Sequence, residues 1–140
     1  IKRYTRKISG PLLDRIDIHV HVPRVKYEDM TSVAKAESSA VIRERVLAAR
    51  EIQMERLREW GIFCNAQMSH AILKKTCHLE PEAQNLLAQA FQVMNLSARS
   101  YDRIIKVART IADLDGAATI EAKHVGEAIQ LRDDVGLSVE

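Results

Sequence analysis

The sequence predicts a mainly α-helical fold: a helical bundle preceded by a short helix and one β-strand. Aromatic residues make up only 4% of the 140 residues, and five glycines and three prolines are too few for a turn-rich β-sandwich. Most of the chain repeats its apolar residues every three or four positions, which is the period of an amphipathic helix. Capping residues stand where these repeats begin, and glycines stand where two of them end.

The first part of the chain is predicted to be a short helical turn followed by a strand. Residues 9–11 read Ser-Gly-Pro, which favours a helix start because Pro is accepted in the first helical turn. Apolar residues then alternate with polar ones up to a proline, at Ile16, Ile18, Val20 and Val22. Since the backbone groups of a strand need partners, we expect the rest of its sheet to lie outside this chain. Residues 24–38 have no clear period and are expected to form a linker.

A long helix is predicted at residues 39–60, closed by Gly61. Its buried side is expected to carry Ile42, Val46, Ala49 and Ile52. Its other side mixes arginines with glutamates, and we expect the arginines there to be solvated, namely Arg50, Arg56 and Arg58.

Three shorter helices follow from caps and apolar stripes. One lies within residues 65–77 and is capped by Ser69; another covers residues 79–94, with Pro81 near its first position. The stripe of the second is Leu86, Leu87, Ala90 and Met94. The last covers residues 119–132, with Thr119 as the predicted N-cap and Glu121 in the first turn, where the helix dipole favours an acid.

The most strongly patterned helix is predicted at residues 97–114, between the N-cap Ser97 and Gly116. Its apolar stripe is Tyr101, Ile104, Ile105, Ala108, Ile111 and Ala112. Arg99 and Arg103 lie one turn apart near its start, where the helix dipole disfavours cations. Such a placement is consistent with an anionic partner; the alternative is that both arginines are simply solvated.

Composition and spacing argue against several classes of function. A formal net charge of +2 is too small to indicate nucleic-acid binding by itself, and no apolar run is long enough to cross a bilayer. Cys64 and Cys77, with His70 and His78 nearby, lack the close ligand pairs of zinc sites, so we expect no metal site and reduced cysteines, as in cytoplasmic proteins. His19 and His21 lack a third ligand and are expected on the exposed face of the strand.

Three segments carry a family resemblance. Residues 7–20 contain Leu-Leu-Asp-Arg-Ile, residues 39–53 contain Ser-Ala-Val-Ile-Arg-Glu-Arg-Val, and residues 96–114 contain Leu-Ser-Ala-Arg-Ser-Tyr-Asp-Arg. In this order they resemble the core end, the C-terminal domain start and the signature helix of the magnesium-chelatase-like AAA+ ATPases, the YifB/ComM group. The resemblance implies that residues 1–36 are the end of an AAA+ α/β core plus a linker, partly disordered without its sheet, and that residues 37–140 are a helical lid.

The resemblance also implies a site. Arg15 would be an arginine finger that reaches ATP in a neighbouring subunit, and Arg99 would be the sensor-2 arginine on ATP of its own subunit, with Arg103 as the fallback if the register differs by one turn. ATP and Mg²⁺ would be bound mainly by an upstream core, in a homo-oligomeric ring, expected to be a hexamer, that processes DNA. Because no Walker A or Walker B motif is present, this chain alone is not expected to hydrolyse ATP.

Two other readings use different residues. The chain could be a nucleic-acid-binding module that uses the arginines of the long helix, Arg43, Arg45, Arg50, Arg56 and Arg58. It could also be a helical bundle that only docks a partner. For Arg15 itself, the alternative to a finger is an ordinary ion pair with Asp14 or Asp17.

Overall fold

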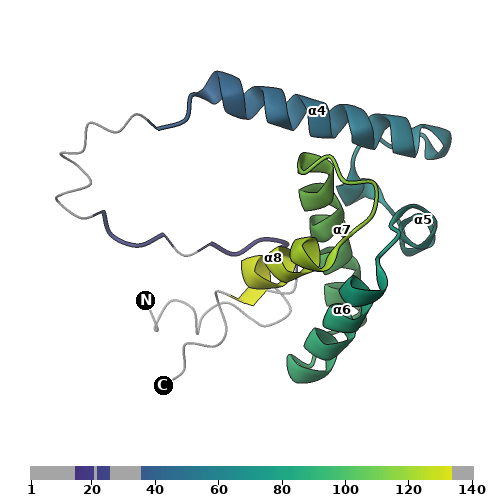
Figure 1. Ribbon diagram of the computed structural model, residues 1–140. Coiled ribbons are helices and arrows are strands. Elements are labelled where there is room, and N and C mark those ends of the chain that lie inside the picture. Colours follow the sequence, from purple (N-terminus) through teal and green to yellow (C-terminus); the bar gives the residue numbers. More distant parts are fainter. Residues whose placement is uncertain (1–14, 21, 26–35, 134–140) are drawn as a thin grey trace.

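The structure, a computed structural model, describes residues 15–20, 22–25 and 36–133 of the chain. Its helices are α4 (Ser39–Leu57), α5 (His70–Thr76), α6 (Pro81–Val93), α7 (Ala98–Leu114) and α8 (Ala122–Asp133), with 3-10 turns at Arg58–Trp60 and Asn65–Gln67. Helix α7 contacts α4, α5 and α8, and α8 also contacts α6, while α4 crosses over the other helices (Figure 1). The predicted mainly α-helical fold is confirmed.

Side-chain caps begin three of these helices, with Ser38 at α4, Ser69 at α5 and Ser97 at α7. The hydroxyl of Ser97 accepts a hydrogen bond from the backbone N–H of Ser100 at 3.2 Å, and that of Ser69 accepts one from Ile72 at 3.4 Å. Both caps are those that the sequence predicts. Gly61 and Gly116 have φ angles of 64° and 68°, the left-handed conformation that ends a helix and that glycine adopts without strain.

The hydrophobic core is built around α7. Ile104, Ile105, Ala108 and Ala112 are each at most 2% exposed, as the stripe predicts, and Tyr101 and Ile111 pack at the edge. The other helices and loops add further buried side chains, among them Leu57, Leu73, Ala83, Leu87, Ile120 and Val125. A short parallel bridge between Leu79 and Ile120 joins the α5–α6 connection to the α7–α8 connection.

The predicted strand is wrong for the part of it that the structure describes. Residues 15–20 and 22–25 form no strand, and His21 and residues 1–14, which include most of the predicted N-terminal helix, lie outside the described residues. His19, expected on an exposed face, is only 9% exposed, and its backbone N–H donates to the carbonyl of Leu131 at 2.6 Å. The segment therefore lies against α8 instead of pairing with a second strand.

Two details of the helices also differ from the prediction. The buried residues of α4 are Ala49, Gln53 and Leu57, all in its second half, whereas Ile42, Val46 and Ile52 are 44%, 47% and 40% exposed. Ile42 and Val46 line an open cavity between α4, the end of α7 and the start of α8, so they face these helices without packing against them. Thr119 does not cap α8; its hydroxyl donates to the carboxylate of Glu80 at 2.9 Å.

His124 supports the start of α8 in its place. Its Nδ1 accepts a hydrogen bond from the backbone N–H of Glu121 at 3.0 Å, which leaves Nε2 as the protonated nitrogen that donates to Asp115 at 3.1 Å. A side chain three residues into the helix thus satisfies the donor at the capping position, as in a capping box. With its ring buried among these partners, His124 joins the α7–α8 turn to α8.

Candidate functional site

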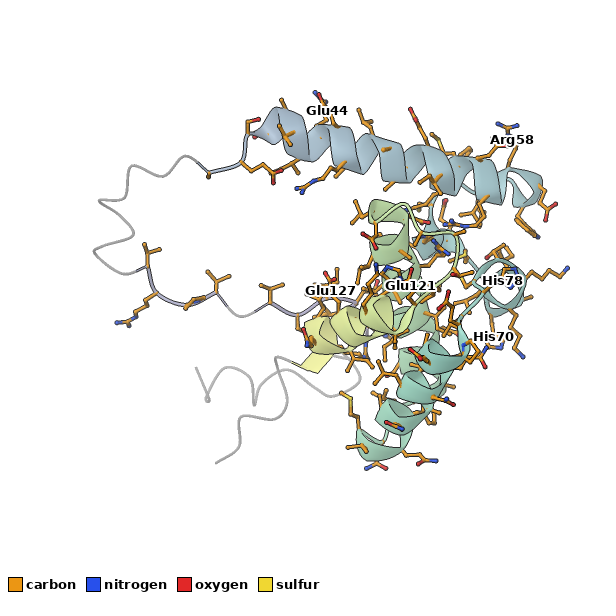
Figure 2. All side chains as sticks on the ribbon, in the orientation of Figure 1. Glu44, Arg58, His70, His78, Glu121 and Glu127 are labelled. Atoms are coloured by element: carbon orange, nitrogen blue, oxygen red, sulfur yellow. The ribbon has the colours of Figure 1, made fainter. Side chains whose placement is uncertain are left out.

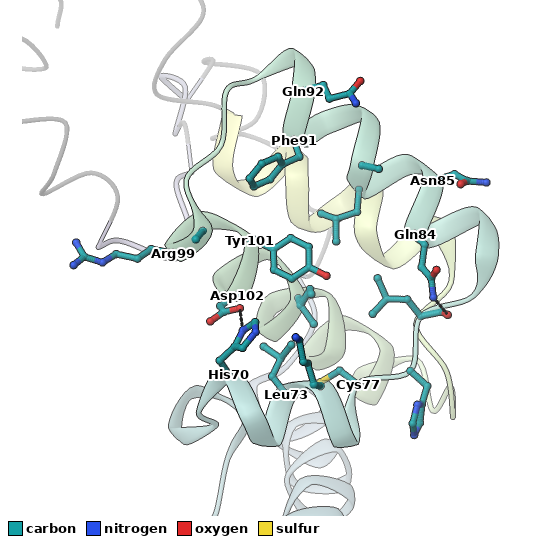
Figure 3. Close-up of a pocket in the computed structure, with 17 residues that line it drawn as sticks. His70, Leu73, Cys77, Gln84, Asn85, Phe91, Gln92, Arg99, Tyr101 and Asp102 are labelled. Carbon is teal, nitrogen blue, oxygen red and sulfur yellow. Dashed lines mark hydrogen bonds and ion pairs between the residues drawn. The ribbon is translucent and has the colours of Figure 1, made fainter.

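The two arginines near the start of α7 have different surroundings. Arg99 is exposed, and no residue in the described part of the chain pairs with its guanidinium. Figure 3 shows this side chain pointing outward from the beginning of α7. Arg103, one turn later, is 28% exposed at the side chain and is paired with Asp17. Of the two, only Arg99 presents an uncommitted cation to solvent.

A broad groove borders Arg99, between α5, α6 and the first half of α7. Its volume is about 1210 Å³, larger than the pockets of roughly 300–1,000 Å³ that usually enclose a small ligand. His70 Nδ1 lies 2.7 Å from the Asp102 carboxylate at one wall, and the Tyr101 and Phe91 rings meet edge to face across it (Figure 3). The groove holds no nucleophile paired with a base, because its His–Asp pair has no hydroxyl or thiol on the other ring nitrogen.

Cys77, the thiol that lines this groove, is not a reactive centre. Burial raises the pKa of its thiol above the ordinary value of 9.0, partly offset by a hydrogen bond with Thr76. The thiol therefore stays protonated at neutral pH, and a thiol is a poor nucleophile and metal ligand compared with a thiolate. Within the described ranges, no three His, Cys, Asp or Glu side chains lie close enough to hold a metal ion.

Arg103 brings the predicted finger segment against α7. Its Nη1 donates to the backbone carbonyl of Arg15 at 2.7 Å and pairs with the carboxylate of Asp17. The side chain of Arg15 itself is exposed, and Asp17 pairs with Arg103 and not with Arg15. All three predicted site residues thus lie at the first half of α7: Arg99 and Arg103 on the helix, and Arg15 through its backbone.

Further contacts hold the same segment on α8. Arg132 donates to the carbonyl of Ile16 at 3.5 Å and to the hydroxyl of Ser100 at 2.9 Å. The Nδ1 of His19 lies 3.1 Å from the carbonyl of Arg132, and since a carbonyl only accepts, this nitrogen carries the proton. Residues 15–19 therefore lie along α7 and α8.

A buried ionic cluster is the largest polar feature that the sequence analysis did not anticipate. Asp113 has a fully buried carboxylate that accepts from Arg109 at 3.0 Å and, through two bonds of 2.7 Å, from Arg56. Arg109 is 1% exposed and also donates to the carbonyls of Ala117 and Ala118. Asn65 completes the cluster by donating to Asp113 at 2.9 Å and accepting from Arg56.

This cluster is structural. Burial lowers the pKa of Arg109, and the negative charge of Asp113 opposes that shift, so the guanidinium stays charged inside the fold. Arg56, expected on the solvated face of α4, is instead only 18% exposed at its side chain. The spacing of Arg109 and Asp113, four residues apart on one helix, was the available signal, since such pairs face each other on a helix.

Among the other arginines of α4 and of the turn after it, Arg45 and Arg58 are paired at the surface, whereas Arg43 and Arg50 are exposed and form no ion pair within the described residues. Arg45 binds Glu37 at 2.8 Å, and Arg58 pairs with Glu55. Figure 2 shows Glu44 of α4, and Arg58 in the turn after it, on the side turned away from the other helices. Acids and bases alternate here, so this face presents no continuous positive surface. None of the described helices is both long and apolar enough to cross a membrane.

Comparison with known proteins extends over almost the whole chain. Residues 36–132 match the family model described as magnesium chelatase, subunit ChlI C-terminal, and residues 1–30 match the one described as magnesium chelatase, subunit ChlI. Competence protein ComM of Haemophilus influenzae is 39% identical over 133 residues, which cover 94% of this chain and 25% of that protein. The uncharacterized protein YifB of Escherichia coli is 37% identical over 131 residues, 93% of this chain and 25% of its own length. The chain thus spans about a quarter of the length of these curated relatives.

Proposed function

The chain belongs to the magnesium chelatase subunit ChlI C-terminal family, and from this premise we propose that it is the lid region of an AAA+ ATPase. Residues 37–140 would form the lid, and residues 1–36 would be the end of the α/β core plus a linker. The phosphate-binding loop and the ligands of Mg²⁺ would come from the upstream core, so the lid contributes to ATP binding and hydrolysis without completing the site. The core would lie against the side of the lid that carries the start of α7.

The observation that carries this proposal is that the guanidinium of Arg99 is unpaired in the described part of the chain, whereas that of Arg103, one turn later, is already bound. A cation at a helix start is unfavourable unless it meets an anion, and a triphosphate is such an anion. Because Arg103 is already bound to Asp17 and to the Arg15 carbonyl, Arg99 is the better candidate for the sensor-2 arginine. When bound, ATP would place its terminal phosphate within reach of Arg99.

Arg15 is proposed to act on ATP of the neighbouring subunit. Its side chain is exposed while its backbone is held by Arg103, so a guanidinium is presented outward from a fixed point. A planar, permanently charged guanidinium stabilises the charge that spreads over the phosphoryl oxygens during transfer. This role requires the homo-oligomeric ring, which we propose to be a hexamer.

The cellular role follows the relatives. One of them carries the name competence protein, and by analogy we propose that the full-length protein is a cytoplasmic motor that processes DNA. A nucleic-acid-binding module centred on α4 is the second candidate. Pairing of Arg45, Arg56 and Arg58 with carboxylates speaks against it, because a guanidinium must leave its carboxylate before it can neutralise a phosphate and displace the counterions of the nucleic acid. Only the exposed Arg43 and Arg50 of the five arginines form no ion pair within the described residues.

The proposal is tested by ATP hydrolysis in the full-length protein with Arg99→Ala, beside a binding titration of a non-hydrolysable ATP analogue. Turnover is expected to fall sharply with the fold intact, while Arg43→Ala, at an exposed arginine of α4, leaves turnover unchanged. If Arg99→Ala changes neither turnover nor analogue affinity, the sensor assignment is wrong. Salt-dependent DNA affinity of the 140-residue chain, lost on Arg43→Ala, would support the second candidate instead.

A further inference from the structure

Arg103 makes contacts that a surface ion pair does not need. It binds Asp17 by charge and also donates to the backbone carbonyl of Arg15 at 2.7 Å, two acceptors on one short segment. Its side chain is 28% exposed and that of Asp17 is 52% exposed. Exposed pairs of this kind add little to the stability of a fold. The geometry is therefore better suited to fixing where Arg15 sits than to stabilising the bundle.

The segment is also held at its other end. His19 donates its backbone N–H to Leu131 at 2.6 Å and its Nδ1–H to Arg132 at 3.1 Å, and its ring is buried. Between the two ends, Arg132 donates to the carbonyl of Ile16. Contacts to α8 thus hold the backbone of residues 16–19 in place. Among the described residues, the contact that holds the backbone of Arg15 comes from Arg103.

We propose that Arg103 is a positioning residue that couples Arg15 to the nucleotide contact of Arg99. Arg99 and Arg103 are four residues apart on one helix, about 6 Å along its axis, and a helix moves as a rigid body over that distance. A shift of α7 on nucleotide binding at Arg99 would therefore carry the Arg15 backbone with it. The nucleotide state of each subunit would then change the position of its Arg15 at the ATP site of the neighbouring subunit.

This inference rests on the proposed function, because it matters only if Arg15 acts on ATP. The charges also balance. Arg103 is neutralised by Asp17, so this pair has no net charge, and Arg15 has no carboxylate partner among the described residues. Arg103 acts through Arg15 and is not itself expected to touch nucleotide.

The test is single-turnover and steady-state ATP hydrolysis by the full-length protein carrying Arg103→Ala, Arg103→Lys and Asp17→Asn, each alone and combined with Arg15→Ala. Misplacing a catalytic group by about 1 Å costs on the order of 100-fold in rate. Arg103→Ala is therefore expected to lower kcat by roughly 10-fold to 100-fold, with KM and ATP-analogue affinity unchanged. Arg103→Lys should retain part of the rate, because it keeps the charge and loses the fork geometry.

The combined variants decide the matter. If Arg103 acts only through Arg15, then Arg103→Ala causes no further loss of kcat once Arg15 is Ala. A full further loss in that background, a rise in KM, or no effect of Arg103→Ala at all would overturn the inference while leaving the finger role of Arg15 intact. If Arg15→Ala alone leaves kcat unchanged, the proposed finger is wrong and this inference falls with it.

Discussion

Arg109 and Asp113, one turn apart on α7, form an ion pair in which the two side chains are 1% and 0% exposed. A second arginine, Arg56 of α4, binds the same carboxylate from the other side. One carboxylate therefore binds two guanidinium groups inside the fold, and the cluster of three side chains keeps a net positive charge. The pair joins α4, α7 and the α7–α8 turn, because Arg109 also binds the carbonyls of Ala117 and Ala118.

Removing this carboxylate should be costly. Asp113→Ala leaves two arginines without a counter-charge in a buried site, and breaking a buried pair in this way costs about 3–5 kcal/mol of unfolding free energy. Urea unfolding of the 140-residue chain measures the loss. Glu55→Ala is the matched control, since it removes an exposed carboxylate that also pairs with an arginine and should cost about 0–1 kcal/mol. Similar losses for the two variants would contradict the structural role of Asp113.

The caps predict a second contrast. Ser97→Ala removes the hydroxyl that satisfies a first-turn N–H of α7 and should lower the unfolding free energy by about 1 kcal/mol. Thr119→Ala removes only an exposed bond to Glu80 and should change it by less than about 0.5 kcal/mol. Thermal unfolding of the two variants distinguishes them, and a larger loss for Thr119→Ala would restore Thr119 as the cap of α8.

The uneven burial of the apolar residues of α4 predicts a third contrast, between Leu57 and Ile42. Leu57 is fully buried, so Leu57→Ala should destabilise the 140-residue chain by about 2–5 kcal/mol. Ile42 is 44% exposed, and Ile42→Ala there should cost less than about 0.5 kcal/mol. The same pair measured in the full-length protein shows whether another part of that protein covers the first half of α4: only then does Ile42→Ala become costly.

The two cysteines should react at different rates. Burial raises the pKa of Cys77, so at pH 8 its thiolate fraction is smaller than that of an ordinary thiol, and its side chain is also inaccessible. Iodoacetamide should therefore modify the half-exposed Cys64 first. The raised pKa of Cys77 also makes the stability of the fold depend on pH. In the unfolded chain the Cys77 thiol ionises above about pH 9.0, whereas in the folded chain it stays protonated to higher pH. The free energy of unfolding therefore falls as the pH rises past that value. Faster labelling of Cys77 in the folded chain would contradict the burial.

The helices and their caps could be predicted because their causes are local. The stripe of α7, the hydroxyls of Ser69 and Ser97 and the positive φ of Gly116 depend on residues within a few positions of each other. The polar contacts around the candidate site are not local. Asp113 binds Arg56, which lies 57 positions away in the sequence, and Arg103 binds Asp17, which lies 86 positions away. A repeating pattern of apolar residues cannot predict such pairs. The apolar stripe of α4 likewise predicts burial of Ile42 and Val46, but a stripe does not show how closely other helices pack, and both residues line an open cavity.

Arg15 gives the most direct test of the ring. Arg15→Ala in the full-length protein should reduce kcat by about 10³–10⁵-fold, the usual effect of losing an arginine finger, and leave the affinity for an ATP analogue unchanged. If Arg15 acts on ATP of the neighbouring subunit, rings of mixed variants provide a further test. Rings that mix Arg15→Ala subunits with subunits whose phosphate-binding loop is inactivated should recover hydrolysis that neither variant shows alone. In such a ring, an intact nucleotide site of one subunit meets the intact Arg15 of the next. If the mixture stays inactive while both variants assemble together, Arg15 does not act across the subunit boundary.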